Sequence, residues 1–264
     1  MKQRILTAIV ALIVFVPFVL YGNLPFTLLV YLLAAIGIWE LMKMRKIKGK
    51  LVPALFAILY VWIILADFIT GDMEFFGLTK SELTIIFIIV LLTYIVFVKN
   101  KFNFDDAAFM LLSACYVGMG FYFLIAAREN GLDYIFYVLF VIWATDTGAY
   151  FVGRALGKHK LWPKISPNKT IEGAIGGIIL ACVVGIIFQL VHPFPYSLAI
   201  MVGITILVSA FGQIGDLVES AYKRHYDVKD SGNILPGHGG ILDRLDSLLF
   251  VLPILYLLGF ISFA

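Results

Sequence analysis

The chain has 264 residues, of which 62% are hydrophobic and only 14% are charged. Its mean hydropathy of +0.99 exceeds that of soluble globular chains, which excludes a soluble enzyme and predicts an integral membrane protein. The formal net charge of +3 is small, so the position of the charges is more informative than their sum. Residues 147–169 and 220–240 are the longest stretches without a strong apolar run, and both are too short for an independent soluble core.

Nine apolar segments are each long enough to cross a bilayer, which requires about 20 residues at a rise of about 1.5 Å per residue. In chain order they cover residues 5–22, 25–42, 52–70, 82–98, 107–127, 132–152, 171–191, 196–218 and 241–262. The first follows Lys2 and Arg4, but no small-residue cleavage site follows it, so we expect a retained helix rather than a signal peptide. The sequence therefore predicts an all-α, polytopic membrane protein with about nine transmembrane helices.

Basic residues predict the orientation of these helices, because Lys and Arg are retained on the cytoplasmic side. With a cytoplasmic N-terminus and nine crossings, all of the 20 Lys and Arg residues except Lys80 and Arg128 fall on that side. We therefore expect a multi-pass protein of the inner (plasma) membrane with its N-terminus in the cytoplasm. The same pattern places the two charged connections, 153–170 and 219–243, on the cytoplasmic face.

Ionisable residues divide the predicted helices into two groups. In the first five, Glu40 and Asp67 lie near helix ends, where we expect a structural role. The last four carry carboxylates toward their cytoplasmic ends, namely Asp146, Glu172, Asp216, Glu219, Asp243 and Asp246. Charges inside a bilayer are costly unless paired or hydrated, so each is a candidate functional residue. We predict a scaffold of about five helices over residues 1–130 and a catalytic region of about four helices over 131–264, which does not fold independently.

The seventh apolar segment carries a small residue at every fourth position, and these are Gly173, Gly177, Ala181 and Gly185. Such a stripe lets helix backbones approach closely. It predicts helix packing, and a homodimer interface is the alternative interpretation.

The connection before that segment, in the stretch DTGAYFVGRALGKHKLWPKISPNKTIEG, is basic. Asp146 lies at the end of the sixth helix, and the cations that follow are Arg154, Lys158, Lys160, Lys164 and Lys169. Ser166 or Asn168 is expected to cap the seventh helix, whose N-terminal amides would favour an anion. A basic run at a membrane edge also fits contact with anionic lipids, and a phospholipid substrate would unite the two interpretations.

The end of the eighth helix and the connection after it combine carboxylates, cations and glycines. Spacings of three or four residues place a carboxylate, a hydroxyl and cations on one helical face, through Asp216, Glu219, Ser220, Lys223 and Arg224. The connection then contains four glycines whose amides can approach a phosphate closely, together with Lys229 and Asp230. The sequence DRLD starts the ninth helix, with Asp243 and Asp246 on one face.

This arrangement predicts a magnesium site that carries a polyphosphate, because Mg²⁺ prefers carboxylate and phosphate oxygens and keeps several waters. The cations would neutralise phosphate oxygens that the metal does not reach. Interfacial salt bridges explain any single pair equally well, but six intramembrane carboxylates on one side favour the site. His238, within GHGG, would donate to a phosphate oxygen, and loop packing is the alternative role.

The order and spacing of these residues resemble the signature of a known enzyme family. The pattern is S-x-x-K-R-x4-K-D-x5-P-x-H-G-G-x-x-D-R-x-D, formed by Ser220, Lys223, Arg224, Lys229, Asp230, Pro236, His238, Gly239, Gly240, Asp243, Arg244 and Asp246. It resembles the signature of the phosphatidate cytidylyltransferases, also called CDP-diacylglycerol synthases. Upstream, Asp146, Ala149, Tyr150 and Gly153 and the segment 166–173 are also similar to that family. The specific resemblance covers roughly residues 140–250.

The resemblance implies transfer of the cytidylyl group of CTP to phosphatidate, giving CDP-diacylglycerol and pyrophosphate for phospholipid synthesis. It implies Mg²⁺ as cofactor, with a second cation left open, and a homodimer in the bilayer with its active site on the cytoplasmic face. We expect no nucleic-acid partner. The expected metal ligands are Asp216, Asp243 and Asp246, and the expected catalytic residues are Lys223, Arg224, Lys229, Arg244, His238 and Ser220. The expected substrate-binding residues are Lys169, Ser166, Asn168, Asp146, Gly239, Gly240 and Asp230.

Three other functions fit parts of the pattern. An ion-coupled membrane transporter would use the carboxylates to relay H⁺ or Na⁺, but they lie near one face instead of the midplane. An intramembrane aspartyl protease expects Tyr-Asp and Gly-x-Gly-Asp, where this chain has ATD and QIGD. A CDP-alcohol phosphotransferase expects D-G-x-x-A-R, which the sequence lacks. We therefore favour the nucleotidyltransferase and keep the transporter as the alternative.

Overall fold

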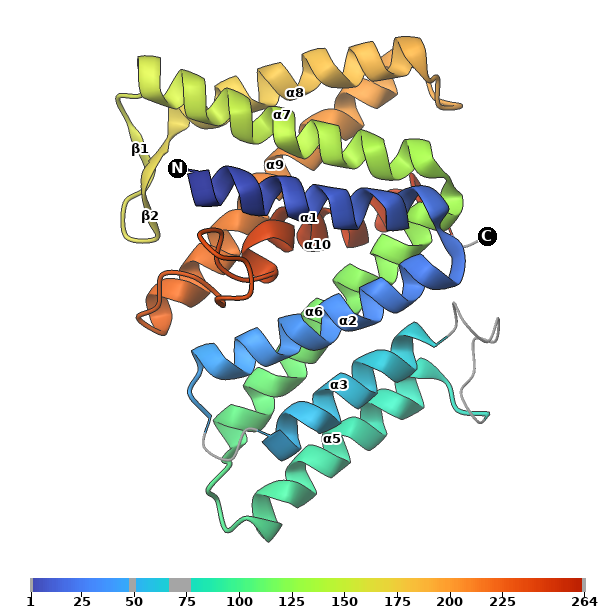
Figure 1. Cartoon of the computed structure of the whole chain (residues 1–264), viewed down its shortest axis with the longest axis vertical. Coiled ribbons are helices and arrows are strands. Elements are labelled where there is room, and N and C mark those ends of the chain that lie inside the picture. The colour runs from blue at the N-terminus through green and yellow to red at the C-terminus, as the bar shows by residue number, and fades with distance from the viewer. Residues whose placement is uncertain (1, 48–50, 67–76, 263–264) are drawn as a thin grey trace. The chain divides into compact units, whose positions relative to one another are not determined.

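A computed structural model describes residues 2–47, 51–66 and 77–262. Over these residues the chain has nine α-helices and one two-stranded antiparallel sheet (Figure 1). Each predicted apolar segment coincides with a helix, which confirms the all-α prediction. Asp67 and the last part of the predicted segment 52–70 lie outside the described residues.

These apolar segments form helices because lipid offers backbone N–H and C=O groups no partners except one another. In chain order they are α1 (Lys2–Tyr21), α2 (Asn23–Met44), α3 (Leu51–Leu65), α5 (Lys80–Phe97), α6 (Phe104–Asn130), α7 (Leu132–Leu156), α8 (Ile171–Val191), α9 (Leu198–His225) and α10 (Leu242–Leu257). Within the described residues, α2, α5, α6, α7, α8 and α9 are long and apolar enough to cross a membrane. The chain is therefore a multi-pass membrane protein, and the number of nine crossings stays a prediction.

The chain forms two compact units. Unit 1 combines Met1–Ile125 with Val228–Arg244, and unit 2 combines Ala126–Asp227 with Leu245–Ala264. The charged connection before α10 thus belongs to the same unit as the first helices. The expected division at residue 130, between a scaffold and a catalytic region, stays a prediction.

In unit 1, α2 packs against α1 and α3, and α3 packs against α5. Val30, Ala34 and Ile38 are fully buried on α2, and their spacing of four residues places them on one side of the helix. Glu40 is also buried, near the C-terminal end of the same helix. The helix therefore brings a carboxylate into the interior of unit 1.

In unit 2, α7 and α8 run side by side along their lengths (Figure 1). The contact depends on the small-residue stripe of α8, because a Cβ atom at Gly173 would lie 2.8 Å from the Ala149 carbonyl oxygen. A Cβ atom at Gly177 would lie 2.7 Å from the Thr145 carbonyl oxygen. Farther along, Gly185 faces Thr205 of α9. The prediction that the stripe packs helices is confirmed, and its partners lie within the same chain.

A hairpin of strands β1 (Lys160–Trp162) and β2 (Ser166–Thr170) joins α7 to α8. The prediction that Ser166 or Asn168 caps α8 was wrong, because both residues belong to β2. Thr170 is the N-cap instead, and its hydroxyl accepts a hydrogen bond from Gly173 N at 3.1 Å. Pro167 disfavours the helical conformation at Ser166, and pairing of β2 with β1 keeps the segment extended up to Thr170.

Candidate functional site

The segment 229–241 forms a tight loop whose shape depends on glycine. Leu235 N donates to the Gly239 carbonyl oxygen at 2.9 Å, and His238 N donates to the Leu235 carbonyl oxygen at 2.8 Å. Gly237 and Gly239 have φ angles of 78° and 85°, in the left-handed region that residues with a Cβ rarely adopt. These two glycines let the chain turn back within a few residues.

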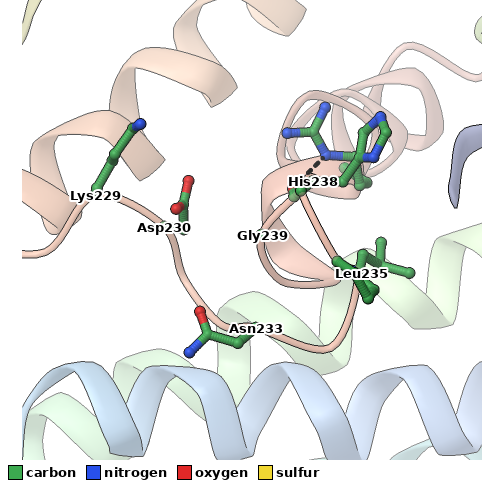
Figure 2. A pocket seen from close by; sticks show the side chains of 9 residues that line it. Lys229, Asp230, Asn233, Leu235, His238 and Gly239 are labelled. Atoms are coloured by element: carbon green, nitrogen blue, oxygen red, sulfur yellow. Dashed lines mark hydrogen bonds between the residues drawn. The ribbon is translucent and has the colours of Figure 1, made fainter. Parts of the chain in front are cut away.

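The loop surrounds a pocket of about 480 Å³ within unit 1. Its lining residues are Lys229, Asp230, Asn233, Leu235, Pro236, Gly237, His238, Gly239 and Arg244. Figure 2 shows Lys229 and Asp230 on the outgoing part of the loop, and Leu235, His238 and Gly239 on its returning part. The pocket therefore collects five predicted site residues: Lys229, Asp230, His238, Gly239 and Arg244.

The polar groups of this pocket suit an anion. Lys229 and Arg244 are exposed to solvent and supply two cationic side chains. Arg244 Nε donates to the His238 carbonyl oxygen at 3.1 Å, which fixes the guanidinium beside the loop. The Nδ1 atom of His238 is buried and, among the described residues, has no hydrogen-bond partner. Because buried polar atoms are normally hydrogen-bonded, this nitrogen is a candidate ligand contact.

Asp243 holds the loop together at its base. Its Oδ2 atom accepts hydrogen bonds from Ser231 N and Gly240 N, both at 2.8 Å, and from Ser231 Oγ at 3.0 Å. Gly240 therefore uses its amide within the loop and does not line the pocket. The predicted contacts of Asp243 with metal and of Gly240 with substrate stay predictions.

Glu40 holds the same region from α2, which gives specific partners to the structural role expected of it. Its side chain accepts from Ile241 N at 2.9 Å and from Leu242 N at 3.0 Å, and its Oε2 atom lies 3.0 Å from Ser231 Oγ, whose one hydrogen it shares with Asp243. Only 2% of the residue is exposed. The sequence offered one signal, a carboxylate inside an apolar segment, but not its partners some 200 positions later.

Unit 2 carries the other predicted polar residues, mostly on α9. Lys169 Nζ pairs with Asp216 Oδ2 at 2.5 Å, and Ser220 Oγ donates to Asp216 Oδ1 at 3.3 Å. One turn farther along, Lys223 Nζ lies 3.6 Å from Glu219 Oε1. The predicted helical face of α9 thus forms, with a cation from β2 on its first carboxylate.

A pair of carboxyl groups lies beside this face. The Asp246 side chain lies close to Glu219, Asp216 and Lys223. Only 2% of Glu219 is exposed. Neighbouring carboxyl groups at low dielectric favour a cation or a proton beside them, since like charges repel, and Lys223 is such a cation for Glu219. Glu219 was noted in the sequence as an intramembrane carboxylate, but it was not assigned to the site.

The remaining predicted residues lie on the hairpin, α7 and the end of α9. Ser166 and Asn168 are on β2, and Asp146 is an exposed residue of α7. Arg224 Nε donates to the Ile165 carbonyl oxygen at 3.3 Å, which ties the end of α9 to the hairpin. These contacts place Arg224 and the hairpin together.

Comparison with known proteins decides the family. The model of the cytidylyltransferase family matches residues 2–262, nearly the whole chain. This chain belongs to the cytidylyltransferase family. The family match thus covers the α2 carboxylate, the loop 229–241 and the α9 face alike.

Three similar proteins of the cytidylyltransferase family come from bacteria. A phosphatidate cytidylyltransferase of Bacillus subtilis (strain 168) is 54% identical over 261 residues, which cover 98% of this chain and 97% of that protein. One from Staphylococcus haemolyticus (strain JCSC1435) is 52% identical over 258 residues, with 98% of each chain covered. One from Staphylococcus aureus (strain COL) is 50% identical with the same coverage.

The resemblance to this family implies magnesium as the cofactor, so the side chains of the site should offer oxygen ligands that suit this ion. Within the described residues, no three His, Cys, Asp or Glu side chains converge closely enough to form a metal cluster. Mg²⁺ does not require one, because it is commonly held by one or two carboxylates together with substrate phosphates and water. The Glu219 and Asp246 carboxyl pair, with Asp216 nearby, fits that requirement.

Proposed function

We propose that this cytidylyltransferase-family chain transfers the cytidylyl group of CTP to phosphatidate, giving CDP-diacylglycerol and pyrophosphate. The observation that carries the proposal is identity of 50–54% over nearly the full length of proteins named phosphatidate cytidylyltransferase. The polar loop and the carboxylate-bearing face of α9 agree with a reaction between phosphates. Nothing in these similarities supports the alternative of an ion-coupled transporter.

The reaction needs no general base in this proposal. The phosphate monoester of phosphatidate is largely ionised near pH 7, since the second pKa of such groups is about 6. One of its oxygens attacks the α-phosphorus of CTP, a new P–O bond forms, and the bond to the pyrophosphate leaving group breaks. Catalysis then consists of positioning and charge stabilisation by the protein.

The pocket of unit 1 would bind phosphate through side chains. Lys229 and Arg244 would neutralise phosphate oxygens, and His238 would donate from Nδ1 when that nitrogen carries a proton. Asp230, Gly239 and Gly240 would shape the site around the bound group. The unpartnered Nδ1 atom and the two cations around one pocket support these roles.

The polar face of unit 2 would supply a second set of contacts. Lys223, Arg224, Lys169 and Ser220 would contact phosphate or pyrophosphate oxygens, and Ser166, Asn168 and Asp146 would contact substrate. Lys169 forms a salt bridge with Asp216 in this structure. Its ammonium would be available to a phosphate if Asp216 turned to a metal ion.

Magnesium is proposed as the cofactor, with a second cation left open. Asp246 and Asp216 would hold the ion, and Glu219 would join Asp246 because the two side chains are neighbours. Asp243 is retained as a proposed ligand from the sequence, although its Oδ2 atom holds the loop. When bound, the ion would stabilise the charge that develops on the leaving pyrophosphate.

We further propose nine crossings, a cytoplasmic N-terminus and a location in the inner (plasma) membrane, with the site on the cytoplasmic face. The concentration of Lys and Arg in alternate connections supports this orientation. A homodimer is also proposed, from the resemblance alone.

Purified protein in detergent tests the proposed reaction. Labelled CTP, phosphatidate and Mg²⁺ should give equal amounts of pyrophosphate and CDP-lipid. Neither product should form when either substrate is omitted. Absence of both products with every divalent cation tried would contradict the proposal, and CTP-independent ion uptake by proteoliposomes would favour the transporter.

A further inference from the structure

Two carboxylates from distant parts of the sequence hold the base of the loop 229–241. Glu40 binds the amides of Ile241 and Leu242, and Asp243 binds the amides of Ser231 and Gly240. The Ser231 hydroxyl lies 3.0 Å from an oxygen of each carboxylate. We call Glu40 and Asp243 the carboxylate clamp.

Glu40 acts on the first residues of α10. The amides of Ile241 and Leu242 precede or begin that helix, where N–H groups lack partners within the helix. The positive end of the helix dipole also favours a carboxylate there. Glu40 therefore occupies the amides of Ile241 and Leu242, and the cationic side chains of Lys229 and Arg244 remain on the pocket to meet an anion.

The carboxylate clamp explains why two positions of the loop are glycine although their backbone conformation does not require it. Gly237 and Gly239 have positive φ angles, whereas those of Gly232 and Gly240 are outside that region. A Cβ atom at Gly232 would lie 2.8 Å from Glu40 Cδ, and one at Gly240 would collide with a Glu40 carboxylate oxygen and with the Ser231 hydroxyl. Glycine at these positions makes room for the buried carboxylate, which shows how closely the loop is fitted around Glu40.

We infer that Glu40 is a positioning residue for phosphate binding, an inference that rests on the function proposed above. It touches no substrate in this proposal. By fixing Ile241 and Leu242 it sets where α10 begins, and hence where Arg244 meets the His238 carbonyl oxygen. The phosphate in the pocket belongs either to CTP or to the lipid, and kinetics with each substrate varied in turn distinguishes the two.

The variant Glu40→Gln tests the inference. It keeps the shape of the side chain, but one carboxylate oxygen becomes an NH₂ group that cannot accept a hydrogen bond. We expect the KM for one substrate, CTP or phosphatidate, to rise at least tenfold while the KM for the other changes less than twofold. Glu40→Asp, which restores the charge on a shorter side chain, should recover part of the loss.

A matched control removes another partly buried carboxylate of unit 1. Asp106 Oδ1 pairs with Arg45 Nε at 2.8 Å, and this contact does not involve the loop. Asp106→Asn should alter thermal stability while leaving both KM values within twofold of the wild type. Unchanged KM values in Glu40→Gln, or equal increases for both substrates, would overturn the positioning role.

Amide hydrogen exchange adds a readout that does not depend on activity. Glu40→Gln should raise exchange at residues 231–242 at least tenfold, and Asp106→Asn should not. If the wild-type protein makes no CDP-lipid, the proposed reaction fails, and pyrophosphate then serves as the probe. Protection of the loop by pyrophosphate in the wild type, weakened in Glu40→Gln, would still support positioning, and equal protection in both would refute it.

Discussion

His238 combines a buried, unpartnered Nδ1 atom with two cationic neighbours around the same pocket. Leaving such an atom without a hydrogen bond costs about 1–3 kcal/mol. A bound phosphate oxygen would remove that cost when Nδ1 carries a proton, and its charge would strengthen the bond. We therefore expect the partner of His238 Nδ1 to be a bound ligand, because its own loop supplies none.

Replacement of His238 by Ala should weaken phosphate binding. Loss of one hydrogen bond to a charged group predicts an increase of about 10- to 100-fold in the KM of the substrate that occupies the pocket. Steady-state kinetics on purified protein would measure it. His192→Ala is the control. His192 lies in unit 2 at the C-terminal end of α8, near Asp133, so this substitution should leave both KM values unchanged. Unaltered kinetics in His238→Ala would assign the residue to loop packing.

Asp246 should control the magnesium requirement. Asp246→Asn keeps the size of the side chain but removes a charge beside Glu219, so we expect the Mg²⁺ concentration for half-maximal activity to rise about tenfold or more. A titration with Mg²⁺ at saturating substrates would measure the change. Asp105→Asn, an exposed residue at the start of α6, is the control. Full activity of Asp246→Asn at the wild-type Mg²⁺ requirement would remove Asp246 from the proposed ligands.

The residue types of the site could be predicted from the sequence, but the contacts that they make in the loop could not. Lys229, His238 and Arg244 follow one another closely, so the pattern alone predicts that they share a site. Glu40 lies about 200 residues before its partners, and no local pattern encodes that contact. Asp243 illustrates a different limit, because its spacing from Asp246 suggested metal binding while its hydrogen bonds close the loop.

The helices were predicted well because each is a long apolar run, and a helix satisfies the backbone hydrogen bonds of such a run in lipid. The hairpin at β1 and β2 was missed, since its strands of three and five residues are too short and polar to give a period of two. The same connection contains Ser, Asn and Thr, all common helix caps. The strand pairing that holds Ser166 and Asn168 inside β2 leaves Thr170, its last residue, as the N-cap.

Close packing of α7 and α8 should be sensitive to a single methyl group. A Cβ atom at Gly177 would lie 2.7 Å from the Thr145 carbonyl oxygen, which belongs to a backbone that cannot move aside cheaply. We expect Gly177→Ala to destabilise the protein by about 1–3 kcal/mol, seen as a lower Tm in detergent. Gly203→Ala is the control, because its added Cβ atom meets nothing within 4 Å. Equal Tm values for the two variants would contradict the packing argument.

For the whole molecule, the proposed reaction constrains orientation, because CTP is water-soluble and phosphatidate stays in the bilayer. The proposed site groups should then face the cytoplasm. Helix α8 has 21 residues, about 31 Å at 1.5 Å per residue, which is enough to cross the hydrocarbon core. If it crosses, the hairpin before it and residues 192–197 after it lie on opposite sides of the membrane.

Single cysteines would test that orientation in intact cells. With Cys115 and Cys182 replaced by Ala, we expect a cysteine at Lys158, on the hairpin side of α8, to resist a membrane-impermeant maleimide until the cells are opened. A cysteine at Tyr196, beyond the other end of α8, should react in intact cells. Retained CDP-lipid synthesis by each variant verifies folding. Labelling of both positions from the same side would contradict a crossing by α8, and the reversed pattern would place the basic connections outside, against the charge bias from which the orientation was predicted.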